Sequence, residues 1–129
     1  MTYCRQAGAK ALAGCAYREA VGYLEQALET LAHLPPGRTT LEQTIDVLSD
    51  LYHALLPLTQ YERMLTHLCG AETLAEGLAD QRRLGIVYCH LANTLRNMQD
   101  YEPALAYCQR AYTVATALGD VELQLWATL

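Results

Sequence analysis

The residues best suited to metal chemistry in this sequence are its cysteines and histidines. Cys89 and His90 are adjacent, and further thiols and imidazoles stand at His53, His67, Cys69 and Cys108. A zinc site needs ligands that converge at about 2.0–2.3 Å, usually from CxxC or His-x3-His spacing. Neither spacing occurs, and adjacent residues on a helix point about 100° apart. We therefore expect neither a metal site nor a cofactor.

Nucleophilic catalysis has little support in the same residues. A covalent catalyst needs a nucleophile beside a base and a turn that stabilises an oxyanion. His67 and Cys69 are two residues apart and would point to different sides of a helix, and no glycine-rich turn accompanies them. A glycine-rich phosphate-binding loop is missing as well, so no nucleotide-binding unit is expected. We predict that the chain is not an enzyme.

The composition limits which compartments and which classes of partner can be expected. The formal net charge of the 129 residues is −5, which argues against nucleic acid because such binding needs a basic face. No stretch approaches about 18 uninterrupted apolar residues, and the first 20 residues lack a secretory pattern, so we expect no membrane span and no signal segment. Five cysteines, an odd number without a CxxC pair, are typical of reduced thiols. The prediction is a cytoplasmic protein.

Helical periodicity supplies the elements that position these residues. In the stretch 91–120, two apolar patterns of helical spacing meet at the polar break Gln99-Asp100. Asp100 is expected to cap the second helix, with Pro103 in its first turn, where the missing N–H breaks no ladder bond. This segment predicts a helix–turn–helix hairpin.

The hairpin recurs along the chain. A shift of 40 residues superimposes Gln60-Tyr61-Glu62 on Asp100-Tyr101-Glu102, and Leu78-Ala79-Asp80 on Leu118-Gly119-Asp120. Another copy begins at Tyr17. Repeats of this size with two helices each indicate an α-solenoid. The fold prediction is all-α, a single repeat domain with units at about 1–36, 38–79, 80–119 and a partial unit at 120–129.

The expected helices follow from caps, prolines and periodicity. Thr39 with Glu42 reads as a capping box, and Pro35 and Pro57 end the helices that precede them. The glycines inside helical patterns, Gly70, Gly77 and Gly85, are expected to permit close helix contacts. The predicted helices cover 3–13, 17–33, 39–56, 61–78, 80–98, 101–118 and 121–129.

Two of these segments resemble the second helix of the tetratricopeptide (TPR) repeat. They are Tyr17-x-x-Ala20-x-x-x-Leu24-x-x-Ala27 and Tyr101-x-x-Ala104-x-x-x-Cys108-x-x-Ala111. The sequence departs from the TPR pattern at Met64, which replaces a small alanine, and in its units of about 40–44 rather than 34 residues. Such long units look like the repeats of large bacterial signalling proteins, including multidomain adenylate/guanylate cyclases with an ATPase module and ATPase-type transcription regulators.

The TPR resemblance implies a concave groove lined by the first helix of each hairpin. It would make the chain a protein–protein interaction scaffold that presents this groove to a peptide or neighbouring domain. Asn side chains there would hydrogen-bond an extended peptide and Arg96 would pair with a carboxylate, while the alternative is that these are merely solvated helix faces. The expected groove positions are Arg5, Asp46, Ser49, His53, Cys89, Asn93, Arg96 and Asn97.

The end of the sequence suggests two further readings. Asp120 is expected to cap a seventh helix that carries apolar residues where a solenoid end would carry a polar face, so we expect a fragment of a longer protein. One alternative function is self-association as a homodimer, through this helix or through the open face of the first helices. The other is an effector-sensing groove closed by Tyr52, His53 and Tyr88. The residues of the self-association surface are Leu123, Leu125, Trp126 and Leu129.

Overall fold

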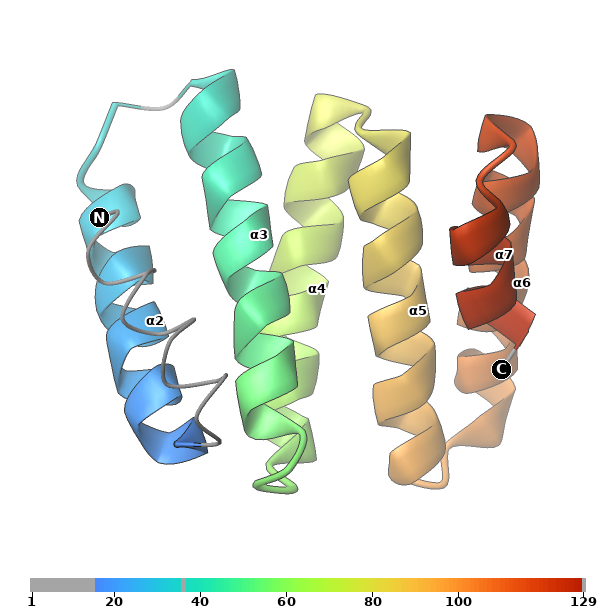
Figure 1. Cartoon of the computed structure of the whole chain (residues 1–129), viewed down its shortest axis with the longest axis horizontal. Coiled ribbons are helices and arrows are strands. Elements are labelled where there is room, and N and C mark those ends of the chain that lie inside the picture. Colours follow the sequence, from blue (N-terminus) through green and yellow to red (C-terminus); the bar gives the residue numbers. More distant parts are fainter. Residues whose placement is uncertain (1–15, 36, 129) are drawn as a thin grey trace. The chain divides into compact units, whose positions relative to one another are not determined.

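The computed structural model describes residues 16–35 and 37–128, the last three of these by their backbone only. Over these residues the chain is all-helical, without a strand, which confirms the predicted class. The predicted helix at 3–13, with Arg5, lies outside the described residues. None of the described helices is long and apolar enough to cross a bilayer. The helices are α2 (Tyr17–Ala32), α3 (Arg38–Leu55), α4 (Tyr61–Leu78), α5 (Gln81–Asn97), α6 (Tyr101–Leu118) and α7 (Val121–Thr128) (Figure 1).

One turn geometry recurs every twenty residues. Thr59, Ala79, Gln99 and Gly119 have φ of 56°, 53°, 63° and 67°, the left-handed conformation that ends many helices. The residue after each donates its N–H to a carbonyl five residues back, as in Asp100 N to Leu95 O at 2.9 Å. This bond satisfies a carbonyl that the helix end leaves open. The 40-residue offset found in the sequence is therefore two helices with two identical turns.

The helix starts agree only partly with the predicted caps. Asp80 and Asp120 accept the backbone N–H of Arg83 and Leu123 at 3.2 and 3.1 Å, so the cap predicted at Asp120 is confirmed. Asp100 holds the N-cap position of α6 without a side-chain cap bond.

The capping box predicted at Thr39 is wrong. Extended Gly37 (φ −159°, ψ 164°) is the N-cap of α3, so Thr39 lies inside the first turn. Glu42 is held instead by Arg38, whose Nε lies 3.0 Å from its Oε1. Because Gly37 is the N-cap and Glu42 is paired with Arg38, the Thr39 side chain does not cap the helix.

The contacts group the residues into two compact units, Met1–His67 and Leu68–Leu129, with the boundary inside α4. In the first unit α2 packs on α3 through one apolar stripe of each helix. Arg63, in the first turn of α4, forms an ion pair with Glu25 of α2. Met64, which a shift of 40 residues places on Ala104, is fully buried. The buried stripes comprise Ala20, Leu24, Ala27 and Leu31 of α2 with Ile45, Leu48, Leu51 and Leu55 of α3.

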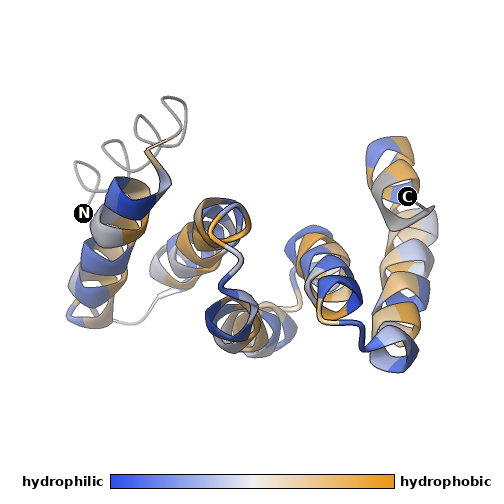
Figure 2. Ribbon diagram, turned by 90° about the horizontal axis from the view of Figure 1, so that it is seen from below, coloured by the Kyte–Doolittle hydropathy of each residue, from blue (hydrophilic) through white to orange (hydrophobic). Residues whose placement is uncertain are grey.

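The second unit consists of the last turns of α4 with α5, α6 and α7. In Figure 2 each helix alternates hydrophilic and hydrophobic segments, as expected of helices that bury one face. Large aliphatic residues of α5 meet small residues of α6, and α7 packs on both helices. Alanines on α6 let its backbone approach α5 closely. The core residues are Leu84, Val87, Leu91 and Leu95 of α5, Ala104, Ala111 and Ala115 of α6, and Leu123 of α7.

Gly85 lies where α5 is in tight contact with side chains of both α6 and α7. A Cβ atom there would lie 2.8 Å from Leu123 Cδ2 and 3.1 Å from Val114 Cγ1, so the close contact predicted for Gly85 is confirmed. The same prediction is wrong for Gly70 and Gly77, where a Cβ would meet nothing within 4 Å. Those two glycines lie on the exposed face of α4.

Substitution of these glycines by alanine tests the packing at Gly85. Overpacking in Gly85→Ala costs about 1–3 kcal/mol, more than the ~1 kcal/mol of helix propensity gained, so we expect a net loss of about 1 kcal/mol. The control Gly70→Ala, which has open space, should gain about 0.5–1 kcal/mol of unfolding free energy. Urea unfolding measures both. Equal gains in the two variants would show that α7 does not press on Gly85.

The recurrent turn predicts a second pair of opposite effects. Ala79 is exposed and has φ of 53°, where an alanine pays a steric cost that glycine does not. Ala79→Gly should raise the unfolding free energy by about 0.5–1 kcal/mol, and Gly119→Ala should lower it by about 1 kcal/mol. Thermal and urea unfolding measure both changes. A loss of stability in Ala79→Gly would contradict the left-handed turn at that residue.

Candidate functional site

The groove residues predicted on α3 share one face of that helix. Asp46 and Ser49 are half-buried, and His53 is exposed one turn further on. The His53 ring meets the Tyr52 ring edge-on at 5.1 Å. Partial burial lowers the pKa of His53, with the carboxylate of Asp50 acting in the opposite direction. This polar face is accessible, and its imidazole favours the neutral form.

The groove residues predicted in the second unit gather near the end of α5. Arg96 Nη2 donates to Asn93 Oδ1 at 2.7 Å, and Asn97 Nδ2 donates to the Asn93 carbonyl oxygen at 2.9 Å. The structure thus brings three of the four together in one hydrogen-bonded cluster. Cys89 stands apart, half-buried, and burial, with a smaller effect of Cys108, raises its pKa to about 11. A thiol with that pKa is protonated at neutral pH and is a poor nucleophile.

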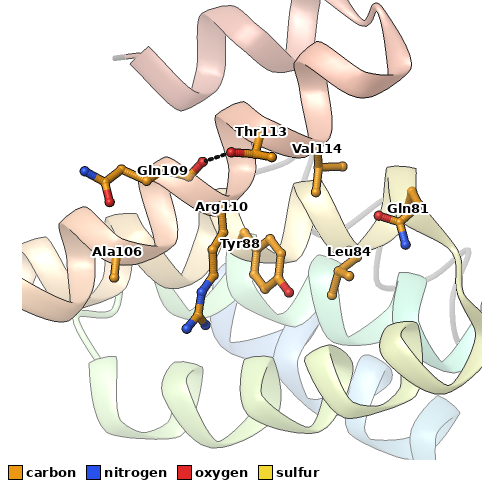
Figure 3. A pocket seen from close by; sticks show the side chains of 8 residues that line it. All are labelled: Gln81, Leu84, Tyr88, Ala106, Gln109, Arg110, Thr113 and Val114. Atoms are coloured by element: carbon orange, nitrogen blue, oxygen red, sulfur yellow. Dashed lines mark hydrogen bonds between the residues drawn. The ribbon is translucent and has the colours of Figure 1, made fainter.

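A cavity of about 500 Å³ opens between α5 and α6 on another face of α5 (Figure 3). Its floor is apolar, because Leu84 and Tyr88 are 6% and 8% exposed. Its rim is polar, and Arg110 is its one lining residue with a formal charge at pH 7. The complete lining comprises Gln81, Leu84, Tyr88, Ala106, Gln109, Arg110, Thr113 and Val114.

Two tyrosines link this cavity to the acidic side of α4. The rings of Tyr88 and Tyr107 lie 5.7 Å apart, and the guanidinium of Arg110 lies 5.2 Å from the centre of the Tyr107 ring. The Tyr107 hydroxyl donates to Glu72 Oε1 at 3.4 Å, and the carboxylate of Glu76 is close enough to Tyr88 to add to the effect of burial in raising the pKa of its hydroxyl. The network fixes the position of Arg110 at the cavity edge through a cation–π contact.

Burial and like charge set the protonation of this network. Burial, and then the neighbouring Glu76, raise the pKa of Glu72 above its usual value. Burial likewise raises the pKa of Tyr88 and Tyr107; the next cause is the carboxylates of Glu76 and Glu72 for Tyr88, and the carboxylate of Glu72 for Tyr107. Both tyrosines therefore stay neutral donors at physiological pH. The arrangement offers hydrogen bonds, an apolar floor and one cation, the kinds of group that line ligand pockets and orient a bound molecule.

Sequence reasoning did not find this cavity, although its residues leave a periodic trace. Gln81, Leu84 and Tyr88 recur at i, i+3 and i+7 on α5, and Ala106, Gln109 and Thr113 do so on α6. Either set looks like an ordinary helix face until the pairing of the two helices is known. Tyr88 belongs to the predicted effector-sensing groove, whereas Tyr52 and His53 are neighbours on α3 of the first unit.

The predicted self-association surface on α7 is divided by the structure. Leu123 is 2% exposed, because the Asp120 cap orients α7 so that this residue packs over Gly85. Leu123 is therefore a core residue, which corrects its assignment to an exposed surface. Leu125 is 58% exposed. The Trp126 side chain and Leu129 lie outside the described residues.

Within residues 16–35 and 37–128, no group of three or more histidines, cysteines or acidic residues is placed to hold a metal ion. Neither a protein-family model nor the sequence of a curated protein matches this chain. Function must therefore be inferred from the surfaces that these helices form.

The raised pKa of Glu72 predicts a pH-dependent stability. The folded state binds the Glu72 proton more tightly than the unfolded state, so ionisation of Glu72 above its folded pKa costs stability. Glu72→Gln keeps an acceptor for Tyr107 and should raise the unfolding free energy at pH 7 by a few tenths of a kcal/mol, a modest effect because the site is partly exposed. The gain should shrink as pH falls through the folded pKa and vanish below the model-compound value of 4.5. Urea unfolding from pH 4 to 8 measures it, and a pH-independent difference would contradict the assignment.

Proposed function

We propose that the chain is a non-catalytic protein-interaction scaffold, a TPR-like α-solenoid that holds a peptide or a neighbouring domain. Consecutive helices joined by identical turns every twenty residues support the repeat architecture. The resemblance of the tyrosine- and alanine-spaced second helices to TPR sequences supports the family. By the same resemblance, the parent is a bacterial signalling or regulatory protein. The odd number of cysteines without a CxxC pair supports a cytoplasmic location.

The observation that carries the binding function is the α5–α6 cavity. Its volume of about 500 Å³ lies within the range of about 300–1,000 Å³ found for ligand pockets. The buried floor of Leu84 and Tyr88 suits an apolar anchor, and the exposed amides of Gln81 and Gln109 suit the backbone of an extended peptide. Polar groups on the rim would orient the peptide, while removal of its anchor from water would supply the affinity.

Arg110 defines the charge that such a peptide should carry. A planar guanidinium binds a carboxylate through two parallel hydrogen bonds. Its contact with the Tyr107 ring reduces the side-chain entropy that binding must remove. The nearby Glu72 and Glu76 would repel a second acidic group. A peptide with one carboxylate next to an apolar side chain therefore fits best.

The polar cluster of Asn93, Arg96 and Asn97 is a separate surface on α5. These residues are centred roughly 140° around the helix from Gln81, Leu84 and Tyr88 and lie nearer the end of α5, so one bound peptide side chain cannot use both sets. Substitutions in the two sets thus distinguish peptide binding in the cavity from peptide binding at the polar cluster, which belongs to the first-helix face that the TPR resemblance implies as the groove.

Peptide binding is tested with ligands selected from a random dodecapeptide library on the purified chain. Calorimetric titration then compares Gln109→Ala/Arg110→Ala with the matched control Asn93→Ala/Arg96→Ala, and circular dichroism checks helicity. We expect the cavity variant to lose on the order of tenfold in affinity, equivalent to about 1.4 kcal/mol, and the control to lose less than about twofold.

The reverse pattern would transfer binding to the first-helix face and overturn the role of the cavity. Failure to select any peptide that binds the folded chain would contradict the peptide-binding function itself.

A further inference from the structure

Glu72 of α4 and Arg110 of α6 both contact the side chain of Tyr107. The Tyr107 hydroxyl donates to Glu72 Oε1 at 3.4 Å, and the Arg110 guanidinium lies 5.2 Å from the centre of the same ring. Burial and then Glu76 raise the pKa of Glu72, whereas the hydrogen bond from Tyr107 and the charge of Arg110 lower it. The Glu72 carboxylate is therefore an internal counter-charge to the Arg110 guanidinium.

Arg110 also lines the α5–α6 cavity, where its charge is available to a ligand (Figure 3). Glu72 is not a lining residue, so a ligand in the cavity meets the charge of Glu72 through space rather than by contact. A carboxylate that binds the guanidinium is attracted by Arg110 and repelled by ionised Glu72. The strength of binding then depends on whether Glu72 carries its charge.

We propose that Glu72 is a specificity-determining residue of the cavity, which weakens the binding of a carboxylate ligand while ionised and takes up a proton when such a ligand binds. This inference rests on the proposed function, the binding of a carboxylate-bearing peptide at Arg110. It adds a regulation of that site, because the affinity of the cavity for an anionic peptide then changes with pH, while its affinity for a neutral peptide does not.

The direction of the pH effect follows from the charges. A bound carboxylate adds a negative charge near Glu72 and engages Arg110, the cation that favours the ionised form of Glu72. Both changes make the pKa of Glu72 higher in the complex than in the free chain. The complex therefore binds the proton more tightly, and by linkage the protonated chain binds the ligand more tightly. Affinity should rise as pH falls from above the pKa in the complex to the pKa in the free chain.

The other groups around Glu72 leave few rivals for this titration. Burial is the first cause that raises the pKa of Cys69, Tyr88 and Tyr107, so all three stay neutral up to about pH 8. Arg110 keeps its charge throughout. Glu76 is the remaining carboxylate and needs a variant of its own. The groups that face Glu72 from its own helix and from α5 and α6 are Cys69, Glu76, Tyr88, Tyr107 and Arg110.

The test uses a selected dodecapeptide without histidine that loses affinity for Gln109→Ala/Arg110→Ala. Its carboxylate is replaced by the sulfonate of cysteic acid in one copy, which keeps its charge at every pH used, and by an amide in another. Calorimetric titration from about pH 4.5 to 8 should show the sulfonate peptide binding about threefold to tenfold tighter at the lowest pH, equivalent to a rise of about half a unit to one unit in the pKa of Glu72. The amide peptide should bind equally throughout.

Glu72→Gln should remove this pH dependence and bind the sulfonate peptide at pH 8 as tightly as the parent chain does at the lowest pH. Titrations in MES and imidazole buffers at about pH 6 should show proton uptake by the parent chain and none by Glu72→Gln, a difference that a merely structural role of Glu72 would not produce. The matched control Glu102→Gln removes the same charge from an exposed position of α6 and should keep the pH profile. Circular dichroism checks helicity at each pH.

Three outcomes would contradict the inference, and they separate it from the proposed function. Binding that depends on Arg110 but not on pH would remove the role of Glu72 and leave peptide binding in the cavity intact. A pH dependence that survives in Glu72→Gln and disappears in Glu76→Gln would transfer the role to Glu76. Failure to find any peptide whose binding depends on Arg110 would overturn the proposed function and this inference together.

Discussion

The left-handed residue in the turn after each of α3, α4, α5 and α6 is the constraint on which the rest of the structure depends. Each such turn closes its helix with a backbone hydrogen bond and reverses the direction of the chain. The next helix therefore starts at the same number of residues after each turn. Three of the four turn residues, Thr59, Ala79 and Gln99, are not glycines and adopt this conformation at a steric cost. Packing of the helices on either side offsets that cost, so local strain and tertiary contact are tied together.

Much of the helical framework could be predicted because it is encoded locally. The aspartates at 80 and 120 mark helix starts by the capping chemistry of their side chains, whereas Tyr61 and Tyr101 mark them only by recurring 40 residues apart. The start of α3 was misassigned to Thr39 because Gly37 supplies the extended cap through its backbone, without a side-chain signal. Propensity rules weigh side chains and overlook such caps.

The cavity and the close contact at Gly85 illustrate what local reasoning cannot supply. Gly70, Gly77 and Gly85 look alike in sequence, yet only Gly85 meets another helix, because α7 folds back over it. The cavity depends in the same way on which face of α5 meets α6. The link from Arg110 through Tyr107 to Glu72 joins residues 38 positions apart, and no spacing rule connects them.

The constant helix-plus-turn length has a consequence for how such chains change over evolutionary time. A tandem duplication of 40 codons adds one hairpin and leaves every cap and buried stripe in phase. After a duplication of another length, the aspartates would no longer fall at the starts of the helices that they cap. Gene segments of this kind can therefore lengthen or shorten in whole hairpins. Terminal faces are then created and covered anew each time, so the surface available for partners changes faster than the fold.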